Sequence, residues 1–244
     1  MEHWGITDSG KVRQHNQDVF KILYDEDKGI AVLVVCDGVG GARAGDVASS
    51  IAAETFMHHI GRYIENIGDI EDIAGKMSEA VSAANLAVFE NSAHKDEYAG
   101  MGTTLTAAIS TQLGEVIANV GDSRAYHVTL NKITQITRDH TVIEDMITRG
   151  DITRAEAHRH PNKHLITRAL GMSSKETPDI FNLNLEIGSH LLLCSDGLSD
   201  VVMDSEILFE LQRGISVRES CENLVRMALS RGAPDNVTAV LFRK

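Results

Sequence analysis

Short, strongly apolar runs are the sequence feature that most restricts how this chain can fold. Five of them are rich in β-branched residues or leucine and are bounded by Gly, Asp or Asn: Gly29 to Cys36, Leu105 to Ser110, Glu115 to Val120, His190 to Cys194 and Val237 to Phe242. Several are apolar almost throughout, which is typical of buried strands. The sequence therefore predicts a core built on β-sheet.

Helical periodicity follows the first of these runs. Apolar residues recur at steps of three and four from Ile70 to Val88, which predicts one long amphipathic helix. Val47, Ile51 and Phe56 indicate a second helix just before it. We expect the two to form a hairpin that packs on a sheet.

Capping patterns mark further helices. Three capping boxes and two stop signals are present: Thr141 with Glu144, Thr153 with Glu156, Ser216 with Glu219, then Gly150 and Gly232. The short helices around residues 141–160 have few strongly apolar positions, so we expect an excursion from the core that could cover a site. Without repeats or linker-like stretches, we expect a single domain over residues 1–244, with this flap at about 141–165.

Charge and cysteine content restrict partners and location. The formal net charge is −12 and no Lys/Arg-rich stripe is present, which argues against nucleic acid. The longest apolar run, Ile30 to Cys36, cannot span a bilayer, and the first five residues do not resemble an export signal. Cys36, Cys194 and Cys221 are few and widely spaced, so we expect a reducing compartment, the cytoplasm.

Carboxylates recur at the edges of the predicted strands. Asp37 and Asp196 follow two of them closely, Asp122 follows Asn119-Val120-Gly121, and Asp235 precedes the last. Any one alone is better explained as a turn residue, but four together indicate a shared site. Oxygen ligands without Cys or clustered His favour Mg²⁺ or Mn²⁺ over zinc or copper.

Longer motifs around these residues indicate a family. In chain order they are Arg13-Gln14-His15-Asn16-Gln17-Asp18, Asp37-Gly38-Val39-Gly40-Gly41, Met101-Gly102-Thr103-Thr104, Gly121-Asp122-Ser123-Arg124-Ala125-Tyr126, Ser195-Asp196-Gly197-Leu198 and Asp235-Asn236-Val237-Thr238. This ordered set spans nearly the whole chain and resembles the metal-dependent protein serine/threonine phosphatases of type 2C (PPM), in their bacterial single-domain branch. Two further segments match those flanking the family's flap: Arg138-Asp139-His140-Thr141 and Ile166-Thr167-Arg168-Ala169-Leu170-Gly171.

The resemblance implies a fold and an activity. The fold is α+β: a β-sandwich of two mainly antiparallel sheets, flanked by helices on both faces in four layers (αββα), with a small flap subdomain. The activity is hydrolysis of phosphoserine and phosphothreonine on proteins in signal transduction. We expect phosphorylated proteins as partners, including a bacterial Ser/Thr protein kinase that the enzyme opposes, no nucleic-acid or membrane partner, and a monomer.

The resemblance also implies a site with two core Mn²⁺ or Mg²⁺ ions. Asp37 would bridge them, the carbonyl of Gly38 would ligate one, Asp196 and Asp235 would hold the other, and Asp18 would act through water. A hydroxide that bridges the metals would attack the phosphate.

Two further roles follow from the same resemblance. Asp122 together with Asp196 would form a third, weaker metal position, and Arg13 would grip the phosphate with its planar fork.

Two departures from the family pattern concern the site. Val39 stands where many relatives have the histidine proposed as general acid, so that role is unassigned, and Gln17 replaces a Glu, which lowers the negative charge near the metals. Histidines 158, 160 and 164 lie in the expected flap without a cysteine, so we expect a solvated or packing role for them.

Two other kinds of function stay open. One is an inactive family member that binds a phosphorylated partner as an adaptor, although every metal aspartate is retained. The other is a nucleotide-binding loop at the glycines 38, 40, 41 and 45, whose spacing differs from Gly-X-Gly-X-X-Gly.

Overall fold

The computed structural model describes residues 1–39, 44–64, 67–94, 96–157, 160–162 and 164–244. Gly40 and Gly41 of the second motif, and His158, lie outside the described residues. The strands are β1 (Glu2–Asp8), β2 (Asp18–Asp25), β3 (Ile30–Val39), β4 (Gly102–Thr103), β5 (Leu105–Thr111), β6 (Gly114–Val120), β7 (Arg124–Val128), β8 (Ile133–Gln135), β9 (Asp179–Leu183), β10 (His190–Cys194) and β11 (Val237–Arg243). The helices are α1 (Gly45–Tyr63), α2 (Ile70–His94), α3 (Val142–Arg149), α4 (Arg154–Ala157), α5 (Asp196–Ser199), α6 (Asp204–Leu211) and α7 (Val217–Ser230), with a 3₁₀ turn at Asp96–Tyr98.

The strands form two sheets. One has the order β1-β11-β10-β7-β8 and the other the order β2-β3-β5-β6-β9, with β4 paired to β3. Neighbouring strands are antiparallel throughout both sheets. The two-sheet α+β fold expected from the family resemblance is therefore confirmed.

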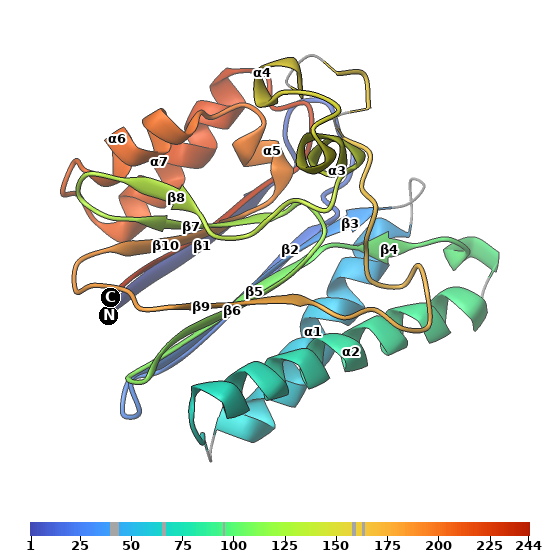
Figure 1. Ribbon diagram of the computed structural model, residues 1–244, viewed down its shortest axis with the longest axis horizontal. Helices are drawn as coiled ribbons and strands as arrows, with labels where there is room; N and C mark the ends of the chain where they lie inside the picture. Colours follow the sequence, from blue (N-terminus) through green and yellow to red (C-terminus); the bar gives the residue numbers. More distant parts are fainter. Residues whose placement is uncertain (40–43, 65–66, 95, 158–159, 163) are drawn as a thin grey trace.

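Four layers follow one another in Figure 1, from α6 and α7 through the two sheets to α1 and α2. Three clusters of buried apolar side chains hold these layers together. The helical hairpin of α1 and α2 packs on the second sheet through residues such as Phe56 and Met77. On the other outer face, α7 packs on the first sheet through Leu224, and the two sheets meet around Leu33 and Ile117.

The hairpin of α1 and α2 and the five predicted strands are confirmed. The strand boundaries shift by at most a few residues, and both helices extend beyond the residues that indicated them. Of the predicted helix ends, Thr141 caps α3 by accepting a hydrogen bond from the backbone N–H of Glu144, and α3 stops at Gly150, whose φ is +78°.

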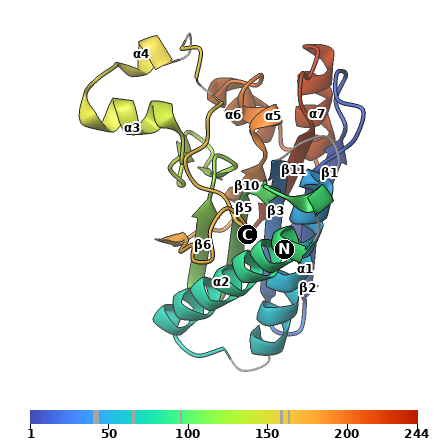
Figure 2. The ribbon, with the colours of Figure 1, turned by 90° about the vertical axis from the view of Figure 1, so that its right-hand side faces the viewer.

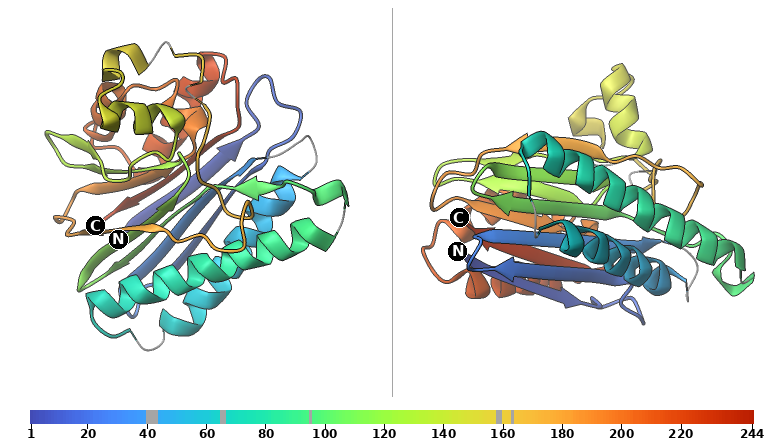
Figure 3. Two further views of the ribbon diagram at one scale, coloured as in Figure 1. Left: turned by 45° about the vertical axis from the view of Figure 1, so that its right-hand side comes forward. Right: turned by 90° about the horizontal axis from the view of Figure 1, so that it is seen from below.

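Figures 2 and 3 show α3 and α4 standing apart from the sandwich, as expected for an excursion from the core. We call the segment from Thr141 to Leu165 the flap. Among the described helices, none is both long enough and apolar enough to cross a membrane.

We predict that replacing a side chain between the sheets destabilises the protein strongly. Ile117 is fully buried in the cluster that joins them, so Ile117→Ala is expected to lower the free energy of unfolding by about 2 to 5 kcal/mol, through lost burial and a residual cavity. The matched control is Ile187→Ala, because Ile187 is 93% exposed and should cost less than about 0.5 kcal/mol. Urea unfolding followed by circular dichroism measures both, and equal effects of the two variants would contradict this packing.

Candidate functional site

The antiparallel pairing places two aspartates opposite each other. Asp18 begins β2 and Asp37 lies near the end of β3, and the two residues are direct cross-strand partners. Like charges in that position destabilise a sheet unless something compensates them. The first sequence motif and the second therefore meet at one end of the sandwich.

The other sheet brings three more carboxylates to the same end. Asp196 follows β10, and Asp235 lies just before the neighbouring β11, whose Thr238 carbonyl accepts a hydrogen bond from Ser195 N–H at 3.1 Å. Asp122 precedes β7, which pairs with β10 on its other side. An antiparallel sheet places the end of one strand beside the start of the next, so residues more than 100 positions apart converge here.

A cleft of about 810 Å³ opens over this convergence. Its lining includes all but one of the residues to which the sequence assigned a role: Arg13, Asp37, Gly38, Asp122, Asp196 and Asp235. The remaining one, Asp18, is only 4% exposed and lies beneath the cleft. The structure thus brings every sequence-predicted site residue together.

Burial and mutual repulsion dominate the electrostatics of this cluster. Burial, followed by repulsion from Asp18 and the other aspartates, raises the pKa of Asp37 well above its ordinary value. The pKa of Asp196 is raised well above its ordinary value by burial and then by repulsion from Asp122. Burial raises the pKa of Asp18 to about 6 and that of Asp122 to about 7. The protein alone therefore stabilises the ionised form of these carboxylates poorly.

Some carboxylate oxygens in the cluster lack a protein partner. Ser195 Oγ and Thr238 Oγ1 each donate to Oδ2 of Asp18 at 2.7 Å, whereas Oδ1 of Asp18 is buried and has no hydrogen-bond partner among the described residues. Oδ1 of Asp196 is likewise buried and has no hydrogen-bond partner among the described residues. Unpartnered buried carboxylate oxygens within an acidic cluster fit a hard divalent cation, which takes oxygen ligands.

Backbone hydrogen bonds fix Asp37 in place. Its N–H donates to Thr104 Oγ1 at 2.9 Å, and its carbonyl accepts from Thr104 N–H at 2.8 Å and from Thr103 Oγ1 at 2.9 Å. At the next residue, the N–H of Gly38 donates to the Gln17 carbonyl at 3.1 Å. A Cβ at Gly38 would lie 2.1 Å from the Gly45 carbonyl oxygen, so only glycine fits there.

Asn236 attaches the N-terminal loop to the site. Its Nδ2 donates to the carbonyls of Ser9 and His15 at 3.0 Å, and its Oδ1 accepts from Gln17 N–H at 2.9 Å. The loop held in this way carries Arg13, whose guanidinium donates to Oδ2 of Asp235 at 2.7 Å. The arrangement places a cationic fork beside an acidic cluster, which suits a ligand that is anionic and also binds metal.

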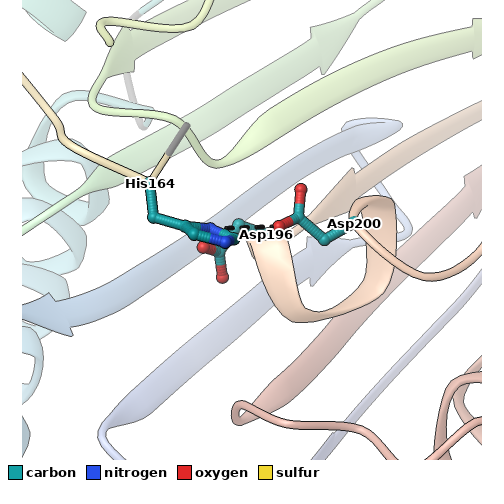
Figure 4. A group of neighbouring side chains, drawn as sticks. All are labelled: His164, Asp196 and Asp200. Atoms are coloured by element: carbon teal, nitrogen blue, oxygen red, sulfur yellow. Dashed lines mark ion pairs between the residues drawn. The ribbon is translucent and has the colours of Figure 1, made fainter. Parts of the chain in front are cut away.

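Two further residues line the cleft: His164, for which the sequence predicted a solvated or packing role, and Asp200, to which it gave none. Figure 4 shows His164 reaching from the flap toward Asp196 and Asp200, with Nδ1 of His164 3.1 Å from Oδ2 of Asp200. One potential ligand atom from each of the three lies within 4.8 Å of the others. Asp200 lies one helical turn after Asp196, a spacing that could have drawn attention to it, whereas the position of His164 depends on how the flap folds over the site.

Comparisons with known proteins point to one family. The family model described as protein phosphatase 2C matches residues 9–241. The serine/threonine phosphatase Stp of Listeria innocua is 34% identical over 98% of this chain and 94% of that protein. The crystal structure of the serine/threonine phosphatase Stp1 from Staphylococcus aureus superposes with a TM-score of 0.91 at 35% identity, covering 100% of this chain and 94% of that one. The catalytic domain of the serine/threonine phosphatase PstP in complex with two manganese ions gives a TM-score of 0.83 at 35% identity, over 98% and 96% of the two chains.

The raised pKa values predict how stability depends on pH. With folded pKa values of about 6 for Asp18 and about 7 for Asp122, against an ordinary 3.8, the folded metal-free protein binds more protons than the unfolded chain between about pH 4 and pH 7. Its stability therefore falls as pH rises through this window. Added Mn²⁺ should raise the melting temperature more at pH 8 than at pH 5, because it replaces protons in the cluster.

Thermal melts in chelator and in Mn²⁺ measure both effects. Asp122→Asn should flatten the pH dependence of the metal-free protein, while Asp27→Asn, at an exposed turn position, should leave it unchanged. A metal-free melting temperature that climbs steadily from pH 5 to pH 8 would contradict the assignment.

Proposed function

The chain belongs to the protein phosphatase 2C family of serine/threonine protein phosphatases, and on this premise we propose that its five clustered aspartates hold divalent cations for hydrolysis of phosphoserine and phosphothreonine in proteins. The observation that carries the proposal is the convergence of Asp18, Asp37, Asp122, Asp196 and Asp235 at the cleft, beside Arg13. Phosphoryl transfer needs neutralisation of the phosphate oxygens and an in-line nucleophile.

The proposed ligand set is the one that the family resemblance implies. Asp37, the cross-strand partner of Asp18, would be shared by two ions, and the Gly38 carbonyl would be a further ligand of one of them. Asp196 and Asp235 would hold the other ion, and Asp18, beneath the cleft, would act through a water. When bound, the pair of Mn²⁺ or Mg²⁺ ions supplies a bridging hydroxide as nucleophile and neutralises charge on the phosphate.

A third, weaker ion is proposed between Asp122 and Asp196. Repulsion from Asp122 is the largest charge effect on the pKa of Asp196, and both residues line the cleft. His164 and Asp200, beside Asp196, extend the same acidic end of the cleft.

Arg13 is the proposed phosphate-binding residue. Its side chain is 53% exposed and uses one nitrogen to donate to Asp235, while the guanidinium carries five N–H donors in all. A planar fork holds two phosphate oxygens and orients the ester for in-line attack. Leu165 and Met172, both exposed on the cleft wall, offer apolar contact to the residues flanking a phosphorylated side chain.

The remaining proposals concern organisation and setting. We propose a single phosphatase domain over residues 1–244 in which the flap controls access to the cleft. Its partners are phosphorylated proteins, including a Ser/Thr protein kinase that it opposes, and it works as a monomer. The cytoplasm is the proposed location, since Cys36, Cys194 and Cys221 are free and buried, as suits a reducing compartment.

Asp37→Asn tests the proposed site most simply. Turnover of a phosphothreonine peptide in Mn²⁺ is expected to fall at least about 100-fold, because the bridging charge is lost. The metal-free melting temperature should stay the same or rise, since one of several repelling carboxylates is removed. The control is Asp27→Asn, which should keep wild-type turnover. If Asp37→Asn keeps most of its activity, the assignment of the site is wrong.

A further inference from the structure

His140 occupies the junction between the flap and the turn that carries Asp122. Its side chain is only 7% exposed. Its backbone N–H donates to the Gly121 carbonyl at 3.0 Å, and its Nδ1 accepts from Gly121 N–H, also at 3.0 Å. One residue therefore holds both hydrogen-bonding groups of the glycine that precedes Asp122.

The hydrogen bond from Gly121 N–H determines the tautomer of the imidazole ring. Because Nδ1 accepts from an N–H group, the ring proton must lie on Nε2. Nε2 lies 3.2 Å from Oδ2 of Asp179 on β9 and 2.9 Å from Nη1 of Arg168. A guanidinium nitrogen cannot accept, so the proton on Nε2 is donated to Asp179. The nearby Arg168 donates to Oδ1 of Asp179 at 2.8 Å and to Glu176 Oε1 at 2.9 and 3.0 Å, so it holds the acceptor in place.

The Gly121 turn has little freedom to find another position. Its φ of +106° lies in the region that favours glycine, and a Cβ there would meet the Thr104 side chain at 2.5 Å. The Oγ1 atom of Thr104 in turn accepts a hydrogen bond from Asp37 N–H and lies 2.8 Å from Ser123 Oγ. The turn of Asp122 is thus held between His140 on one side and the support of Asp37 on the other.

The same histidine forms the base of the flap. Its carbonyl accepts from Thr167 N–H at 2.8 Å, where the chain returns from the flap. The next residue, Thr141, pairs with Ile166 and caps α3. A shift of the flap base must therefore act on His140 and, through Gly121, on Asp122.

We propose that His140 is a positioning residue that holds Asp122 in place for the third, weaker cation and couples that position to the base of the flap. The inference rests on the proposed third ion between Asp122 and Asp196. It assigns to His140 no contact with substrate or with metal.

Two amide substitutions separate hydrogen bonding from simple filling of space. In His140→Asn the amide oxygen can occupy the place of Nδ1 and accept from Gly121 N–H. In His140→Gln the amide lies one carbon further out, near the place of Nε2, and the acceptor for Gly121 is lost. A role in hydrogen bonding predicts that Asn preserves function better than Gln, while a role in filling space predicts the reverse, because Asn leaves the larger void.

The measurement is calorimetric titration of the chelator-treated full chain with Mn²⁺, which reads binding without turnover. For His140→Gln we expect the weakest Mn²⁺ site to lose at least about tenfold in affinity, as is typical for loss of an outer partner of a metal ligand, while the tighter sites stay within about twofold. His140→Asn should stay within about threefold of wild type at every site. Asp122→Asn should abolish the weakest site, and His190→Gln, at the far end of β10, should change none.

The variants also separate the role of His140 from the presence of the third ion. If Asp122→Asn abolishes the weakest site and His140→Gln leaves it intact, the role of His140 is refuted while the third ion stands. If Asp122→Asn changes nothing, the third ion and this inference fall together, while the two-ion site tested by Asp37→Asn is untouched. Equal losses in the Asn and Gln variants would also refute the positioning role. Should His140→Gln fail to fold, imidazole nitrogen NMR of the wild type decides: we expect protonated Nε2 and bare Nδ1, and the opposite tautomer would overturn the inference.

Discussion

Repulsion among buried carboxylates is the interaction on which the rest of this structure depends. Two like charges about 4 Å apart near a protein surface repel by about 4 kcal/mol. Here five aspartates converge at a cleft, four in its lining and Asp18 beneath it. Hydroxyl donors from Ser195 and Thr238 and the guanidinium of Arg13 compensate part of this charge. Burial raises the pKa values of Asp18, Asp37, Asp122 and Asp196, and repulsion raises those of Asp37 and Asp196 further. The same crowding of carboxylates is the basis of the divalent-cation site proposed above.

The sandwich supplies the rigidity that such a cluster needs. Each aspartate lies at or near a strand end, and the strands belong to two sheets that pack face to face through a continuous apolar layer. Thr103 at the end of β4 and Thr104, which follows it, fix the backbone of Asp37, while Asn236 fixes the loop that carries Arg13. These hydrogen bonds within the motifs thus hold the aspartates close together against their mutual repulsion.

Among the described residues, the flap is attached to this centre at a well-bonded junction at its base and through the contact of His164 with Asp200. His140 and Thr167 join its two ends, and an ion-pair network of Arg168, Glu176 and Asp179 lies immediately behind them. Beyond the junction, His164 returns to the cleft beside Asp196. The base of the flap and the turn of Asp122 are therefore joined through few residues, which is the basis of the coupling proposed above between the flap and the third ion.

Local patterns in the sequence predicted the elements and side chains whose position depends on near neighbours. The buried strands β3, β5, β6, β10 and β11 follow from apolar runs, and the aspartates at or near strand ends follow from turn chemistry and the family motifs. Strands β1 and β2 were not predicted, because their residues are mostly half-exposed and give no continuous apolar run. The contact of His164 with Asp200 and the hydrogen bonds between His140 and Gly121 depend on how distant segments pack. No local sequence pattern encodes this packing.

Release of phosphate from a phosphothreonine peptide, with and without Mn²⁺ after treatment with chelator, tests whether the aspartates act by holding cations. We expect no measurable release from the metal-free protein and restored release on adding Mn²⁺. Undiminished release in excess chelator, or no release by folded protein at any Mn²⁺ concentration, would contradict it.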